Sequence, residues 1–171
     1  MRYKLPLIVL LFLVPLSLIL AQAPKNRTEV LRTFKACIRP NRLTTLDCSE
    51  DFVGNVIDLY DRGDHSLLKP LLDVGLSSDG ALSEMLGDLY SHVLSKNPRR
   101  FLAFVQSRPI KQKRHLCWMA GATDGSRMGT QMLHDVRHSL RVISSRGADS
   151  LSSVARICLA NVNRANASNG R

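Results

Sequence analysis

Aromatic residues are scarce in this sequence. Phe, Trp and Tyr make up 5% of the 171 residues, and Trp occurs once. Proteins that read single-stranded nucleic acid stack successive bases on several exposed aromatic rings. The sequence offers no such aromatic platform and no known recognition motif, so it argues against sequence-specific nucleic-acid binding.

Long apolar runs are also missing, except at the N-terminus. Residues 5–20 are apolar apart from two prolines and one serine; they follow the basic start MRYK and precede Ala21-Gln22-Ala23. This order is typical of a secretory signal peptide, whereas a membrane-spanning helix needs about 20 apolar residues. We therefore predict a cleavable signal peptide at 1–23 and a periplasmic or secreted protein. A retained membrane anchor is the alternative.

The four cysteines include no CxxC pair. They are separated by 10, 68 and 40 residues, which matches no common zinc-binding pattern. An even number of cysteines in an exported chain favours disulfides, and four cysteines allow three pairings. We favour Cys37–Cys48 and Cys117–Cys158; the alternative is that some are buried free thiols. No metal or cofactor is expected.

Acidic residues are few in the second half of the chain. Residues 24–95 hold 8 basic and 11 acidic residues, whereas residues 96–171 hold 14 basic and 3 acidic, a net charge of +11. Such a field attracts an anionic polymer, a membrane surface or an acidic protein. The alternative is a solvated basic face that only aids solubility. The predicted contact residues lie in the acid-free segment 96–115: Arg99, Arg100, Lys111, Lys113 and Arg114.

Helical periodicity dominates what remains, and no strand pattern is convincing. Asn97-Pro98 is a helix start signal, Gly121 a helix stop, and Pro70 bends or splits a helix near 65–74. We predict an all-α, disulfide-stapled single domain of seven or eight helices at 24–164 and a disordered polar tail at 165–171. Apolar residues recur at spacings of three and four in six segments, at 30–38, 52–60, 82–94, 101–105, 128–143 and 151–162.

A short internal similarity bears on the architecture. Residues 56–60 read VIDLY and residues 86–90 read LGDLY, each late in a predicted amphipathic helix and followed by a break and a second apolar helix. Two such hairpins are typical of a short solenoid-like stack. The same pattern also arises in an irregular compact bundle, because its helices must all bury one face. Both architectures stay open.

The tripeptide Arg62-Gly63-Asp64 occurs in extracellular adhesion sequences, but its place in this chain favours a structural role. The preceding amphipathic helix ends near Asp61. Gly63 suits the left-handed residue after a helix, and Asp64 suits the N-cap of the next one. We interpret the tripeptide as a helix-to-helix turn.

Two histidine motifs are better explained by structural or surface roles than by chemistry. His134 and His138 are four apart on one helical face, as metal ligands often are, but they share that face with arginines. His115 and Cys117 are two apart, and residues with that spacing point in different directions on a helix. We expect a solvated face in the first case and a buried half-cystine in the second.

Glu84 and Asp88 are the best candidates for catalysis. Paired carboxylates can perform acid–base chemistry on glycans, but these two lie opposite the apolar stripe of their helix. The sequence thus predicts an exported, non-enzymatic helical binding protein that contacts an anionic partner through a basic face. The alternative is a cell-envelope glycan hydrolase.

Overall fold

The computed structural model describes residues 27–37, 50–122 and 127–169. All regular structure in these ranges is helical, so the all-α prediction is confirmed. None of the described helices is long and apolar enough to cross a membrane. The predicted signal peptide and the side chains of Cys37 and Cys48 lie outside the described residues.

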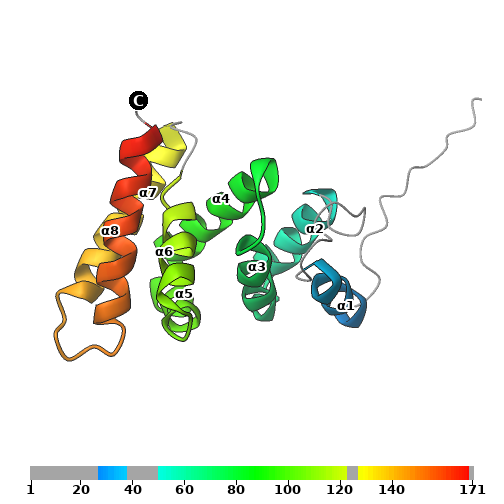
Figure 1. Cartoon of the computed structure of the whole chain (residues 1–171), viewed down its shortest axis with the longest axis horizontal. Coiled ribbons are helices and arrows are strands. Elements are labelled where there is room, and N and C mark those ends of the chain that lie inside the picture. Colours follow the sequence, from blue (N-terminus) through cyan, green and yellow to red (C-terminus); the bar gives the residue numbers. More distant parts are fainter. Residues whose placement is uncertain (1–26, 38–49, 123–126, 170–171) are drawn as a thin grey trace, which may run out of the picture.

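The helices succeed one another along the longest axis of the molecule, from α1 at one end to α7 and α8 at the other (Figure 1). Helix α4 is central, because it packs against α2, α3, α5, α6 and α7. The elements are α1 (Arg27–Cys37), α2 (Glu50–Asp61), the 3-10 helix η2 (His65–Leu67), α3 (Leu68–Gly75), α4 (Gly80–Lys96), α5 (Pro98–Gln106), α6 (Ile110–Met119), α7 (Arg127–Ser144) and α8 (Ser152–Asn169).

Two predicted helix boundaries have the expected physical cause. Asn97 caps α5, because its side-chain oxygen accepts a hydrogen bond from the Arg100 N–H at 3.4 Å, and Pro98 is the first helical residue. The predicted helix near 65–74 is split into η2 and α3. Pro70 lies in the first turn of α3, where its missing N–H costs no helical hydrogen bond.

The turn at Arg62-Gly63-Asp64 connects α2 to η2, as predicted. Gly63 has a φ of 112°, and its N–H donates to the Tyr60 carbonyl at 2.9 Å. Asp64 precedes η2 but makes no side-chain cap; its carboxylate accepts from the Ser66 hydroxyl and pairs with Arg27 of α1 at 3.6 Å. The aspartate of this tripeptide therefore ties α1 to the turn.

Tyr90 of α4, one of the two tyrosines in the DLY similarity, anchors the centre of the core. It is fully buried, its hydroxyl donates to the Leu71 carbonyl at 2.7 Å, and its ring centroid lies 5.8 Å from that of Phe101. Burial, and after it the charge of Asp73, raises the pKa of Tyr90 well above its usual value. Tyr90 is thus a neutral hydrogen-bond donor that joins α4 to α3. Tyr60 is likewise buried, and its ring contacts that of His65, which follows the turn after α2.

Helices α6 and α8 approach each other most closely. The predicted disulfide Cys117–Cys158 is present, with the two Cα atoms 4.8 Å apart. Gly121 follows α6 as predicted, but for a different reason than a left-handed cap: a Cβ atom there would lie 2.6 Å from the Cα of Val162 in α8. The glycine is required by backbone contact between the two segments.

Helix α8 extends to Asn169, so the predicted disordered tail at 165–171 is wrong for residues 165–169. Ala165 is fully buried and lies three residues after buried Val162. This pair continues the apolar stripe of α8 by one turn, and the small side chain of Ala165 made the continuation hard to recognise in a polar sequence.

We predict opposite effects on stability for alanine at two glycines. Gly121→Ala should lower the free energy of unfolding by about 1–3 kcal/mol or more, because the new methyl group must displace the α8 backbone. Gly54→Ala, in the interior of α2 where a Cβ meets nothing within 4 Å, should raise it by up to about 1 kcal/mol. Urea denaturation of both variants checks this, and an unchanged Gly121→Ala protein would contradict the close approach.

Removal of the disulfide should also be costly. Cys117 and Cys158 are 41 residues apart, and the loop-entropy model assigns about 4 kcal/mol to a closed loop of that length. Without reducing agent, so that the wild-type disulfide stays intact, the double variant Cys117→Ala/Cys158→Ala should unfold at a lower urea concentration than the wild type. Equal midpoints would show that α6 and α8 are held by packing alone.

Candidate functional site

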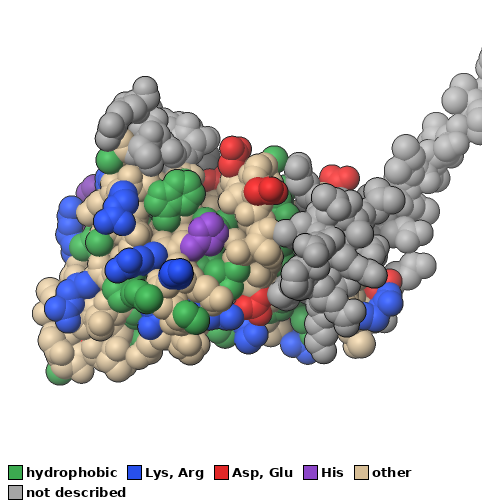
Figure 2. Space-filling view, viewed as in Figure 1, with side chains coloured by type: hydrophobic (Ala, Val, Ile, Leu, Met, Phe, Trp, Pro, Cys, Tyr) green, Lys and Arg blue, Asp and Glu red, His purple; other side chains and the backbone are tan. Residues whose placement is uncertain are grey.

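The five predicted contact residues lie on two adjacent helices. Arg99 and Arg100 are in the first turn of α5, and Lys111, Lys113 and Arg114 are on α6. Of these, Arg100 and Lys113 are half-buried, and the other three are exposed. Figure 2 shows lysines and arginines concentrated over the end of the molecule formed by α5–α8, with acidic side chains mostly toward the other end. The charge asymmetry of the sequence is thus also an asymmetry along the molecule.

Arg108, also in the basic segment, has a structural partner. It forms an ion pair with Asp73 of α3, and both side chains are mostly buried. Asp73 also accepts from Lys69 at 2.9 Å. This pair fastens the end of α5 to α3, so Arg108 is unavailable to a partner molecule.

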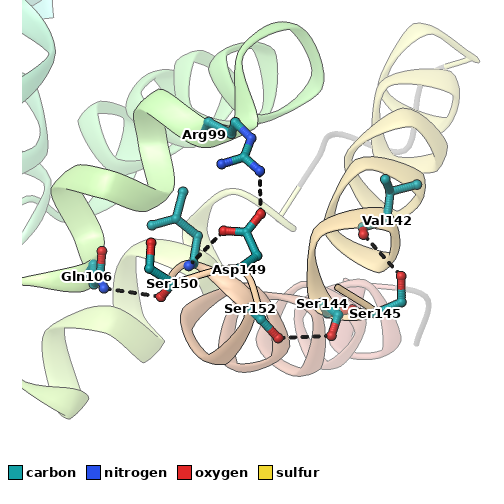
Figure 3. Close-up of polar contacts among 9 residues, drawn as sticks. Arg99, Gln106, Val142, Ser144, Ser145, Asp149, Ser150 and Ser152 are labelled. Carbon is teal, nitrogen blue, oxygen red and sulfur yellow. Dashed lines mark hydrogen bonds and ion pairs between the residues drawn. The ribbon is translucent and has the colours of Figure 1, made fainter. Parts of the chain in front are cut away.

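Arg99 of α5 also has a structural partner, which lies in the turn between α7 and α8 (Figure 3). Its guanidinium pairs with Asp149, whose side chain is only 8% exposed and accepts from the Leu151 N–H at 3.0 Å. The amide of Gln106 donates to the Ser150 carbonyl at 3.2 Å nearby. The Leu151 N–H, and after it the Arg99 guanidinium, hold the pKa of Asp149 below its usual value. Arg99 therefore attaches the α7–α8 turn to α5, while half of its side chain stays exposed.

The outer face of α6 combines cations with large apolar side chains. Ile110, Arg114 and Trp118 are spaced four apart, and Lys111 adjoins them, so all four lie on one side of the helix. Ile110 is 47% and Trp118 37% exposed. The buried residues Leu116 and Met119 lie on the other side of α6, and buried Cys117, seven residues after Ile110, lies at the edge between the two sides. We call these four residues, Ile110, Lys111, Arg114 and Trp118, the α6 face.

Sequence reasoning identified the cations of the α6 face but missed Ile110 and Trp118. Trp118 sits within the apolar run Leu116–Ala120, where it reads as a core residue. The signal was its helical position, because it lies one turn after Arg114 and nearly opposite Leu116. An exposed aromatic residue on the charged side of a helix is informative, because aromatic side chains are usually buried for the most part.

A shallow cleft of about 330 Å³ opens between the α4–α5 junction and α7. Its polar lining includes Lys96, Arg99, His138 and Arg146, and its apolar lining includes Val142. None of the described residues that line it is acidic. The cleft therefore belongs to the positive end of the molecule.

The candidate metal-ligating and catalytic residues lie at the surface or make structural contacts. His134 and His138 are exposed, and His134 lies 3.5 Å from the carboxylate of Asp135. The sulfur of Cys117 is bonded to Cys158, so it is no nucleophile. The ring of His115 instead contacts the Gly75 carbonyl, at 3.1 Å. Within the described ranges, no three His, Cys, Asp or Glu residues are grouped to hold a metal ion.

The two carboxylates of the alternative hypothesis are both exposed on α4, and the cleft is not lined by either of them. Glycan hydrolysis needs two carboxyl groups on opposite sides of a bound sugar. Glu84 and Asp88 instead lie one helical turn apart on the same helix.

Comparison with protein-family models, curated proteins and solved structures finds no match for this chain.

The lowered pKa of Asp149 predicts an acid-dependent loss of stability. Unfolded Asp has a pKa of about 3.9, so this carboxylate contributes fully above about pH 5 and loses its contribution as the pH falls through the lower folded value. The difference in unfolding free energy between wild type and Asp149→Asn should be constant between about pH 7 and pH 5. It should shrink below about pH 4, as measured by urea denaturation. A difference that persists unchanged in stronger acid would contradict the assignment.

Proposed function

We propose that this chain is an extracytoplasmic, non-enzymatic binding protein that contacts an anionic partner through the basic surface of α5 and α6. The observation that carries the proposal is the α6 face, where two exposed cations lie between two exposed apolar side chains. Fixed positive charge on a helix surface attracts anionic groups and raises their rate of encounter.

The distribution of ion pairs favours the α6 face as the contact surface over the whole basic segment 96–115. Arg99 and Arg108 hold neighbouring elements together. Lys111 and Arg114 form no ion pair with any acidic residue in the described part of the chain, and both are exposed. We therefore assign the contact to Lys111 and Arg114, the two exposed cations of α6.

The extracytoplasmic location rests on the predicted signal peptide, and the disulfide supports it. Disulfides persist in oxidising compartments and are rare in the cytosol. A Cys117–Cys158 bond is therefore what an exported chain would use to hold α6 against α8.

Charge reversal on the α6 face tests the proposal. Lys111→Glu/Arg114→Glu should weaken binding to inorganic polyphosphate more than about tenfold at low salt, because each cation close to an anionic surface is worth roughly a factor of five. The dependence of log affinity on log salt should become shallower by about 1.5–2, since two phosphate contacts are lost. Titration calorimetry at several salt concentrations measures both quantities.

The matched control is Arg32→Glu/Arg62→Glu, which changes the net charge equally at two exposed positions in the other half of the molecule. This variant should bind nearly as well as the wild type. If both double variants lose the same affinity, only net charge matters and the α6 surface is not a site. Polyphosphate binding that survives reversal at Lys111 and Arg114 would contradict the proposal directly.

A further inference from the structure

We infer that the α6 face docks on the surface of an anionic phospholipid bilayer, with Trp118 and Ile110 entering the interface and Lys111 and Arg114 contacting the headgroup phosphates. This inference rests on the proposed function and names the partner of the same surface.

The order of side chains along α6 carries the argument. Ile110 and Trp118 are two turns apart, and Arg114 lies on the same line midway between them. The two apolar side chains are also the most exposed large hydrophobic residues of α6, at 47% and 37%. In Figure 2 apolar and cationic side chains lie next to each other at this end of the molecule. The α6 face is therefore a mixed surface and not a purely basic one.

A lipid interface matches both halves of this composition, whereas a soluble polyanion matches one. Phosphate chains and other charged polymers neutralise cations but offer no apolar layer to Trp118 or Ile110. At a bilayer surface, Trp places its ring at the headgroup level, and Lys and Arg extend their charged ends to the phosphates. Anionic lipids add electrostatic attraction to the burial of apolar area.

The packing of α6 limits how deep the contact goes. Leu116, Cys117 and Met119 are buried on the inner side of the helix, and Cys117 is bonded to α8. Helix α6 therefore enters an interface only with its outer side chains, as a peripheral contact. Such a contact depends on the cations as much as on the apolar residues, because two exposed side chains bury little area.

The single tryptophan of the chain makes the inference directly testable, because all tryptophan fluorescence comes from the α6 face. The exported chain is mixed with vesicles of phosphatidylglycerol and phosphatidylcholine in equal parts, with vesicles of phosphatidylcholine alone, or with inorganic polyphosphate. Emission maxima and quenching by lipids brominated at shallow or deep positions are recorded.

We expect a blue shift with the anionic vesicles, stronger quenching by the shallow bromines, and neither effect with phosphatidylcholine alone. Lys111→Gln/Arg114→Gln should lower the partition coefficient about twenty-five-fold, since each neutralised cation removes roughly a factor of five. Polyphosphate should bind without a blue shift, because it supplies no apolar environment to the indole.

Two further variants separate the apolar contribution from charge. Ile110→Ser/Trp118→Ser should lose binding to anionic vesicles in a sedimentation assay while it keeps wild-type affinity for polyphosphate. Val142→Ser, at an equally exposed apolar position on α7, should bind vesicles like the wild type. All these positions are exposed, and thermal unfolding confirms that each variant is folded.

The outcomes distinguish this inference from the proposed function. Suppose that the wild type binds polyphosphate but that anionic vesicles cause neither a shift of the tryptophan emission nor quenching by brominated lipids. This result would overturn the lipid inference and leave the anion-binding function intact. An equal shift with phosphatidylcholine alone would overturn the anionic-lipid assignment. If the wild type binds neither polyphosphate nor anionic vesicles, both the lipid inference and the proposed function are wrong.

Discussion

The contact between α6 and α8 is the constraint on which the positive end of the molecule depends. Gly121 lets the backbone after α6 touch the backbone of α8 at Val162, and Cys117–Cys158 bonds the same pair of segments. A helix held this way has a fixed rotation about its own axis. Cys117 is buried at one edge of the inner side of α6, and Trp118 lies about 100° beyond that edge, away from buried Leu116, so its side chain is exposed.

Basic side chains on neighbouring helices have different roles. Arg99 and Arg108 face other elements, where Asp149 and Asp73 meet them, and these pairs attach the α7–α8 turn and α3 to α5. The cations of the α6 face point away from the core and meet no such acid within the described ranges. Packing thus divides one basic segment into residues that hold the fold and residues that a partner can reach.

Much of the helical layout could be predicted, because most of its signals were local, and the disulfide followed from the even number of cysteines. Asn97-Pro98 begins α5, Gly63 reverses the chain after α2, and Cys117 pairs with Cys158. The errors arose where a local pattern was weak. The last turn of α8 was missed because it buries only a small alanine, Ala165. Gly121 was assigned to a cap, although its true cause is a contact with residues some forty positions later.

The helical fold and the positive charge of the second half follow from the sequence alone, because periodicity and composition do not depend on packing. Which basic side chains form ion pairs, and whether Trp118 and Ile110 are exposed beside the others, depends on how the helices pack. The physical reason is that exposure depends on how a helix is rotated against its neighbours. That rotation is fixed by contacts between residues far apart in the sequence, such as Gly121 with Val162.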